Sequence, residues 1–332
     1  MRRHLAFVVL IISAMVIHIV FYGCKAKDEI FHIGILQWTE KVQPFNQTYK
    51  GLLEGLKDKG YQDAMNLKLD YRNAEQDKAL ALKIAQGFVQ SEVDLIVALG
   101  TGSSLAALEA TEKKEIPIVF SIVGAPKATG IIADNRDSGP NITGVSMKIP
   151  VKDQLETAKE ALPHVKKLGI IYCTEMPQAV ATGKEAAAVA PEFDWTPLVI
   201  SFPKEYLPQL QKIVQSLAQK VDAIYIPTDP ILDSPKNLKT IITISDEHHV
   251  PVITVSENSV EDGALMAVHC DFYGIGRQAA DLIAQVRKGI SPRTIPSQLP
   301  AIKKLSLNLK KAQNLNITIR RNIILKADNI LD

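Results

Sequence analysis

The sequence predicts an α/β fold made of two Rossmann-like lobes, each built on a parallel sheet covered by helices. Two observations predict this class. Short β-branched runs alternate with longer segments of helical period, and the order of these elements repeats in the second half of the chain. With 332 residues, of which 46% are hydrophobic and 22% charged, the chain is long enough for about two globular domains.

The first half of the body alternates between strands and helices. Its strand candidates are short apolar runs rich in valine, isoleucine and leucine, and the segments between them carry apolar residues at helical spacing. The predicted strands are residues 32–36, 67–71, 94–99 and 116–121, and the predicted helices are residues 47–59, 77–90 and 103–113. Each predicted helix joins two strands, which is typical of a parallel sheet.

The second half repeats this order. Its predicted strands are residues 168–172, 198–202, 222–227 and 250–255, and its predicted helices are residues 183–189, 207–219 and 236–248. A further apolar strand, residues 265–268, precedes a helix over residues 274–288. This arrangement predicts a second sheet with the winding of the first.

Three motifs recur in the two halves at nearly equal offsets. The pairs are Gly34 and Gly169 at 135 residues, Val93-Asp94 and Val221-Asp222 at 128, and Pro117 and Pro251 at 134. Near-equal spacing favours duplication of one half. The alternative is coincidence, since Val-Asp before an apolar strand and Pro inside an edge-like strand are common in α/β proteins.

The first 24 residues form a separate segment. Met1-Arg2-Arg3-His4 is a basic start, residues 5–22 are uncharged and mostly apolar, and Gly23-Cys24 follows. Such a segment enters a membrane during export, so we predict a leader over residues 1–23 and a charged tether over residues 24–29. The alternative is an uncleaved anchor helix, because eighteen residues span about 27 Å. Either way, the body is expected outside the cytoplasm.

The end of the leader resembles the lipobox of bacterial lipoproteins, in which a small residue precedes a lipidated cysteine. The resemblance implies that Cys24 is diacylated and becomes the new N-terminus. Phe21 and Tyr22 depart from the usual pattern, which has leucine and a small residue at these positions. Cys24 is the lipidation site that the resemblance implies.

Charge and cysteine content exclude several classes of protein. Without Arg2 and Arg3 of the leader, the chain carries 36 basic and 36 acidic residues, which argues against nucleic-acid binding. Three cysteines are too few for a disulfide scaffold or a zinc site, and no histidine pair has the helical spacing of metal ligands. Cys173 and Cys270 end predicted strands, so we expect two buried free thiols, with a disulfide across the lobes as the alternative.

Two open α/β lobes have a consequence for binding. Ligands of such sheets lie beyond the carboxyl ends of the strands, so two facing edges make a cleft. The loops predicted to line it are residues 37–40, 100–104, 121–123, 228–230 and 256–258. The candidate ligand-binding residues are Gln37, Trp38, Thr101, Gly102, Ser103, Ser104, Ser121, Thr228, Asp229, Glu257, Asp271 and Phe272.

Residues 100–104, Gly-Thr-Gly-Ser-Ser, form the strongest local motif. Small residues let a ligand approach closely, and the free backbone N–H groups of a helix N-terminus bind a carboxylate or another anion. The alternative is that Thr101 or Ser103 caps the helix and satisfies those N–H groups without a ligand.

Several stretches together carry a family resemblance. They are residues 69–74, 93–99, 139–146, 221–229, 263–265 and 271–278. From about residue 30 onward, the chain resembles the substrate-binding lipoproteins of bacterial ABC transporters, in the branch with tryptophan- and tyrosine-binding members. The resemblance implies a type I periplasmic-binding-protein fold, whose lobes close on a ligand about three crossing segments.

The resemblance also implies domain boundaries. The crossings fall at residues 143–148, 269–271 and 296–301. The first lobe then comprises residues 30–145 with 271–297, and the second comprises residues 146–270 with 298–332. The helix over residues 274–288 belongs to the first lobe.

An amino-acid ligand fits the candidate residues by charge. N–H groups after Gly100 would bind its carboxylate, Asp271 or Asp229 its ammonium group, and Trp38 with Phe272 its side chain, with Gln37 and Glu257 as further polar contacts. Two of these residues also have a structural alternative. Asp271 could instead complement the dipole of the helix that follows it, and Trp38 could pack within its own lobe. The chain departs from the family at residues 100–102, where the loop often carries proline after its threonine.

Other functions fit the sequence less well. Residues 100–105 lack the third glycine of a Rossmann phosphate loop, and they follow the third strand instead of the first, which argues against a nucleotide enzyme. A ligand-sensing receptor would need a second membrane span, and residues 316–332 are too polar for one. We therefore expect a monomeric, membrane-anchored binding protein without cofactor, metal or bond chemistry, which delivers a small molecule to an ABC permease and its ATPase.

Overall fold

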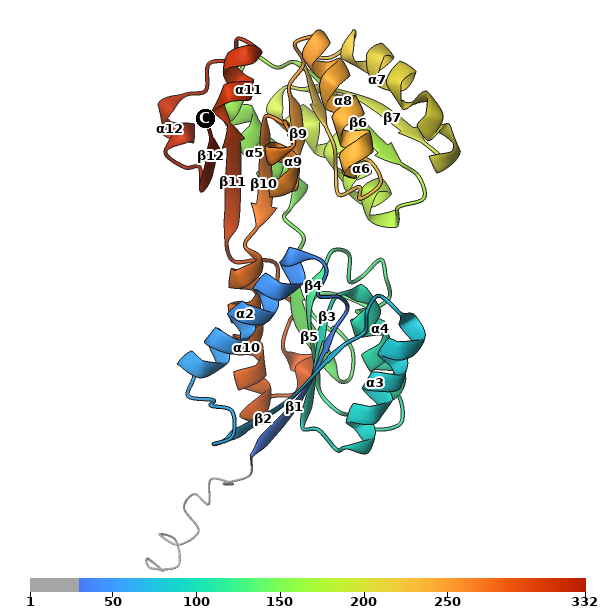
Figure 1. Ribbon diagram of the computed structural model, residues 1–332, viewed down its shortest axis with the longest axis vertical. Helices are drawn as coiled ribbons and strands as arrows, with labels where there is room; N and C mark the ends of the chain where they lie inside the picture. The colour runs from blue at the N-terminus through green and yellow to red at the C-terminus, as the bar shows by residue number, and fades with distance from the viewer. Residues whose placement is uncertain (1–29) are drawn as a thin grey trace, which may run out of the picture.

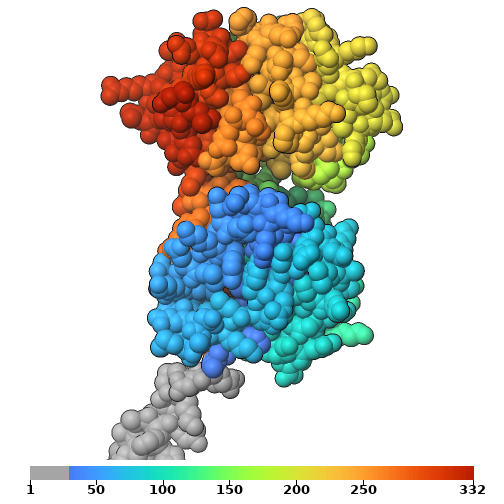
Figure 2. All heavy atoms as spheres, viewed as in Figure 1, coloured from blue at the N-terminus to red at the C-terminus, as the bar shows by residue number. Residues whose placement is uncertain are grey.

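The computed structural model describes residues 30–332, which form two lobes joined by three segments of chain (Figure 1). The predicted leader, the tether and the lipidation site Cys24 lie outside the described residues. In the space-filling view the molecule narrows between the lobes (Figure 2). None of the helices within residues 30–332 has the length and apolar character needed to cross a membrane.

Lobe 1 is a five-stranded parallel sheet in the order β2-β1-β3-β4-β5, with helices on both faces. Successive side chains of each strand point to opposite faces of the sheet, so each face packs against its own pair of helices. Ile33 and Leu95 pack with Leu52 of one helix pair, whereas Leu36 and Ile96 face the other pair. The strands are β1 (Phe31–Gln37), β2 (Leu67–Asn73), β3 (Leu95–Leu99), β4 (Ile118–Val123) and β5 (Ile142–Ser146), and the helices are α2 (Gln43–Asp58) and α10 (Phe272–Arg287) on one face and α3 (Lys78–Gln90) and α4 (Thr101–Thr111) on the other.

Lobe 2 has a seven-stranded sheet in the order β12-β11-β10-β9-β8-β6-β7. Its strands are β6 (Lys167–Cys173), β7 (Thr196–Phe202), β8 (Ala223–Tyr225), β9 (Val252–Thr254), β10 (Met266–Cys270), β11 (Lys303–Asn308) and β12 (Asn329–Leu331). Its helices are α5 (Val151–Ala161), α6 (Pro177–Val189), α7 (Leu210–Ala218), α8 (Pro235–Glu247), α9 (Glu257–Glu261), α11 (Leu309–Asn314) and α12 (Arg321–Ile324), with the 3-10 turns η1 (Ala190–Phe193) and η2 (Lys204–Gln209). The 3-10 turn η3 (Pro292–Thr294) lies against β5 of lobe 1. The sheet is parallel except where β11 pairs antiparallel with β10, a departure from the predicted all-parallel sheet.

The two sheets share one winding order, because β7-β6-β8-β9-β10 repeats β2-β1-β3-β4-β5. The recurring motifs occupy equivalent places. The carboxylates of Asp94 and Asp222 both accept backbone N–H bonds from the start of the first strand of their lobe. The carbonyls of Pro117 and Pro251 both accept from the strand alongside. Equivalent hydrogen bonds at matched positions support duplication over coincidence.

Three segments cross between the lobes and lie beside one another. The first leads from β5 to α5, the second from β10 to α10, and the third from η3 to β11. Gln298 of the third exchanges backbone hydrogen bonds with Gly144 and Ser146 of β5, at 2.9 and 2.8 Å. Asp271 of the second donates its N–H to Ile302 of the third. The third crossing is therefore hydrogen-bonded through its backbone to both of the others.

The predicted elements are present, but several begin elsewhere. α2 begins at Gln43 instead of residue 47, and α6 begins at Pro177 instead of residue 183, because proline in the first turn suits a helix start. The sequence analysis missed α5, although Val151, Leu155 and Ala158 form a buried stripe at helical spacing. It also missed β11, whose pairing with β10 depends on the third crossing.

Candidate functional site

The N-terminus of α4 lies at the carboxyl edge of the lobe 1 sheet. Its N-cap is Gly100, which has a φ of 100° and no side chain to accept a hydrogen bond. Ser104 donates its hydroxyl back to the Gly100 carbonyl at 2.8 Å. The alternative that Thr101 or Ser103 caps this helix is therefore wrong, and no side chain caps its first-turn N–H groups.

Three buried polar atoms near this helix end have no hydrogen-bond partner. They are Oε1 of Gln37, Oγ of Ser103 and Oγ of Ser121. The amide nitrogen of Gln37 donates to Thr39 and to Asn46, both at 2.9 Å, so the orientation of its amide is set. β1, β3 and β4 are neighbours in the sheet, and Gly100 donates its N–H to the Ser121 carbonyl at 2.9 Å, which places these groups along one edge. Buried polar groups rarely lack partners, so this edge has the character of a binding site for a polar ligand.

Trp38 covers the start of α4. A Cβ built on Gly102 would overlap the indole ring of Trp38, and the ring is partly exposed while it packs on the lobe 1 core. Only glycine leaves room for the ring at position 102. Trp38 thus packs within its lobe and also borders the helix N-terminus.

The end of β4 carries backbone strain. Ile122 has a φ of 54°, which is unfavourable for a β-branched residue, and the β4–β5 register shifts between Ser121 and Val123. The shift turns the Val123 carbonyl toward the first crossing, where it accepts from Ser146 Oγ at 2.9 Å and from the Met147 N–H at 3.0 Å. Strained backbone of this kind concentrates at functional sites. Here the strained residue lies between Ser121 and the Val123 carbonyl, which is hydrogen-bonded to the first crossing segment.

A cavity lies where the crossings meet lobe 2, and we call it the inter-lobe cavity. Only Thr228 and Phe272 of the candidate residues line it. The other lining residues, which sequence reasoning did not select, are Gly124, Ala125, Met147, Lys148, Ile149, Gln154, Gln178, Ala181, Thr182, Val255, Val268, His269 and Cys270. Assigning α5 and the first two turns of α6 from the sequence would have pointed to Gln154, Gln178 and Thr182.

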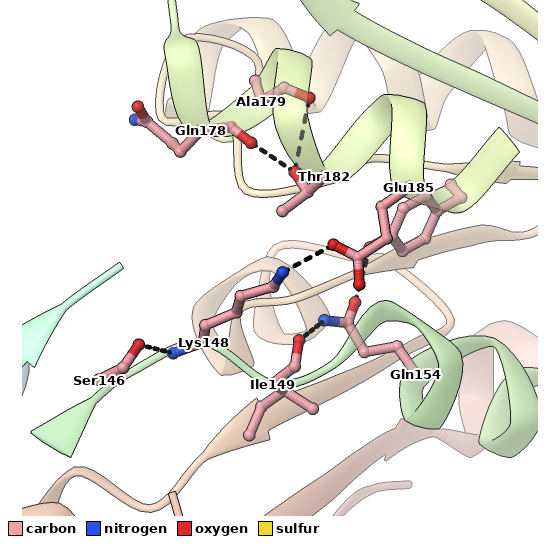
Figure 3. Close-up of polar contacts among 9 residues, drawn as sticks. Ser146, Lys148, Ile149, Gln154, Gln178, Ala179, Thr182 and Glu185 are labelled. Atoms are coloured by element: carbon pink, nitrogen blue, oxygen red, sulfur yellow. Dashed lines mark hydrogen bonds and ion pairs between the residues drawn. The ribbon is translucent and has the colours of Figure 1, made fainter. Parts of the chain in front are cut away.

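Polar contacts organise this cavity (Figure 3). Lys148 of the first crossing reaches across to Glu185 of α6, with Nζ 2.7 Å from Oε2. Gln154 donates its amide to the Ile149 carbonyl at 2.8 Å and accepts from the buried Tyr225 hydroxyl at 2.6 Å. Thr182 donates to the Gln178 carbonyl at 2.7 Å. Most lining polar groups are thus satisfied within the protein.

His269 and Cys270 border the cavity at the end of β10. Nε2 of His269 lies 2.9 Å from Ser306 Oγ, and burial lowers the pKa of this histidine, which favours the neutral imidazole. Burial raises the pKa of both Cys270 and Cys173 to about 12, so both thiols stay protonated. Within residues 30–332, no cluster of three His, Cys, Asp or Glu side chains could hold a metal ion.

Cys173 and Cys270 are both free. Strands β8 and β9 lie between β6 and β10, which puts these cysteines about 14 Å apart at the usual strand spacing. A disulfide needs Cα atoms within roughly 7 Å. The disulfide alternative is therefore wrong, and the expected pair of buried thiols is present.

The carboxylates of the acidic candidate residues differ in how many of their acceptor positions are already used by the protein. Asp229 is buried, and its carboxylate accepts the backbone N–H groups of Cys173 at 2.6 Å, Ile231 at 2.9 Å and Leu232 at 3.1 Å. Asp271 is the N-cap of α10 and lies 3.4 Å from Lys304 Nζ, with its side chain 13% exposed. Glu257 begins α9 and accepts from Asn329. Asp229 is thus occupied by backbone groups, whereas Asp271 has one cationic partner.

Two α/β lobes of like winding, three adjacent crossings and a site between the lobes define the fold of type I periplasmic binding proteins. The family model described as "ABC transporter substrate binding protein" matches residues 32–331. The chain therefore belongs to the family of ABC transporter substrate-binding proteins, which act outside the cytoplasm. The resemblance predicted from the sequence and the predicted fold class are both confirmed.

Similar proteins include binders of aromatic amino acids. The tyrosine-binding protein of Clostridioides difficile (strain R20291) is 31% identical over 265 residues, which cover 80% of this chain and 75% of that protein. A Streptococcus pneumonia ABC domain solved with L-Trp is 27% identical with a TM-score of 0.71, covering 90% of this chain and 99% of that one. An open, ligand-free substrate-binding protein with adhesive properties from Clostridium difficile is 25% identical with a TM-score of 0.81, covering 91% and 98%.

Proposed function

We propose that the protein captures an aromatic α-amino acid between its lobes and delivers it to an ABC permease with its ATPase. The uncapped N-terminus of α4, beside the unpartnered hydroxyls of Ser103 and Ser121, is the observation that carries this proposal. A carboxylate there would accept hydrogen bonds from backbone N–H groups and hydroxyls in a largely buried setting. The tyrosine- and tryptophan-binding relatives support the aromatic side chain.

The remaining contacts follow from the same arrangement. Trp38 borders the carboxylate end of the site, and Phe272 lines the inter-lobe cavity. In this proposal the aromatic side chain of the ligand lies between them. Asp271 takes the ammonium group in this proposal, because the carboxylate of Asp229 is already occupied by three backbone N–H groups. Gln37, Thr228 and Glu257 supply further polar contacts. The protein binds and releases its ligand without bond chemistry.

The setting of this function is also a proposal. We infer that residues 1–23 are a leader, that Cys24 carries the lipid that anchors the protein at the outer side of the cell membrane, and that the protein is a monomer. The lobe boundaries predicted in the sequence analysis belong to the same proposal. Mass spectrometry of the native protein checks it, since a diacylated N-terminal Cys24 supports anchoring and an intact residue 1 contradicts it.

Removal of the two unpartnered hydroxyls tests the carboxylate site. We expect Ser103→Ala and Ser121→Ala each to weaken binding of L-tryptophan and L-tyrosine by about 10- to 100-fold, because a hydrogen bond to a charged group contributes roughly 1.5–3 kcal/mol. Isothermal titration calorimetry measures the affinities. The matched control is Ser245→Ala, since Ser245 of α8 is another buried serine with an unpartnered hydroxyl and lies in the lobe 2 core. Unchanged affinity in both variants, or a wild type that binds neither amino acid, would contradict the proposed function.

A further inference from the structure

Lys148 lines the inter-lobe cavity and forms an ion pair with Glu185 of α6 (Figure 3). The side chains of the two residues are 36% and 34% exposed, so the pair is neither a surface salt bridge nor a sealed one. Among the residues that line this cavity in the described chain, Lys148 is the only lysine, arginine, aspartate or glutamate. The charge on this wall therefore comes from Lys148, with Glu185 as its ion-pair partner.

The Lys148 end of the pair is held by a hydrogen bond of its backbone. The Lys148 N–H donates to Ser146 Oγ at 3.0 Å, and that hydroxyl donates to the Val123 carbonyl at the strained end of β4. On the other side, burial and, as a smaller effect, the charge of Glu185 raise the pKa of Tyr225. Tyr225 in turn binds Gln154. The pair thus joins the first crossing segment to α6 of lobe 2.

The pair also has unused hydrogen-bonding capacity. An ammonium group has three donors and a carboxylate has about four acceptor positions, and the contact between Nζ and Oε2 uses one of each. The neighbouring polar groups of Gln154 and Thr182 are occupied within the protein. Much of the remaining wall is apolar and consists of Met147, Ile149, Val255, Val268 and Phe272. An aromatic ring can pack against this wall while a polar group at its tip meets the pair.

Building on the proposed function, we propose that Lys148 and Glu185 determine specificity at this site by binding the polar tip of the ligand's aromatic side chain. Lys148 donates to a phenol oxygen, and Glu185 accepts from a phenol O–H or an indole N–H. A phenylalanine ring in the same place would leave both charged groups without that partner. Sites built around a hydrogen bond strongly reject ligands that lack the bonding group. The pair thus selects tyrosine or tryptophan against phenylalanine.

Calorimetric titration of the full mature protein with L-tyrosine, L-tryptophan and L-phenylalanine tests this inference. We expect the wild type to bind the better of tyrosine and tryptophan about 100-fold more tightly than phenylalanine. Glu185→Gln and Lys148→Met should each reduce this preference below about tenfold and leave the affinity for phenylalanine unchanged. The control variants Lys152→Met and Glu192→Gln remove an exposed ion pair of 2.6 Å outside the cavity, and they should keep the wild-type preference.

Two outcomes would overturn the role in specificity while the proposed function stands. Equal weakening of all three amino acids would show that the pair only holds the crossing segment against α6, and an unchanged preference would show no contact with the ligand. A wild type that binds none of the three would overturn both proposals. Glu185→Asp retains the charge on a shorter side chain, so it should lower the preference for tyrosine or tryptophan even if Glu185→Gln fails to fold.

Discussion

Gly276→Ala is expected to destabilise lobe 1 by about 3 kcal/mol or more. Gly276 of α10 packs on the backbone of α2, and a Cβ at this position would overlap the carbonyl oxygen of Thr48 and lie 2.6 Å from the backbone nitrogen of Leu52. Backbone atoms cannot rotate away as a side chain can, so the two helices would have to separate. Urea unfolding followed by circular dichroism measures the loss.

The helix pair supplies its own controls. Gly51→Ala tests the reciprocal contact, because a Cβ there would overlap the Tyr273 carbonyl, and it should be as damaging as Gly276→Ala. Gly87 lies inside α3, where a methyl group would meet open space with no neighbouring atom within 4 Å, so Gly87→Ala should stabilise the protein by about 0.5–1 kcal/mol. Equal stability of Gly276→Ala and the wild type would contradict the close approach of α2 and α10.

Asp229→Ala is expected to cost about 3 kcal/mol or more of folding free energy, because three backbone donors lose their acceptor at about 1–3 kcal/mol each. Its carboxylate satisfies the N–H groups of Cys173, Ile231 and Leu232, and the substitution leaves these donors without an acceptor. Thermal unfolding without ligand should show the full loss. Asp229 thus acts by holding the loop after β8 against the end of β6.

The matched comparison is Asp222→Ala. Asp222 also accepts two backbone N–H bonds, from Lys166 and Lys167 at 2.8 Å, but it is exposed, so water replaces the carboxylate and the expected cost is about 1 kcal/mol. If Asp229→Ala unfolds at the wild-type temperature and loses only ligand affinity, Asp229 is a ligand contact and the structural role assigned to it is wrong.

The candidate site was only partly predictable from the sequence. Polar loops after β1, β3 and β4 could be placed at one sheet edge, because strand order and direction follow from the alternation of strands and helices. The inter-lobe cavity could not be placed, because Lys148, Gln154 and Thr182 come from a crossing segment and two lobe 2 helices that meet only after folding. The positive φ of Ile122 could not be predicted from the sequence either, because isoleucine is a common strand residue.

The amino-acid sequence alone predicts the α/β class, the repeated winding of the two lobes, the helix N-terminus after Gly100 and the family. These properties depend on periodicity and on local motifs, which neighbouring residues encode. Only the tertiary structure decided that Gly102 makes room for Trp38, that Asp229 serves the backbone and that Lys148 faces Glu185. Such contacts join residues distant in the chain, and their energies depend on burial and distance, which local sequence does not specify.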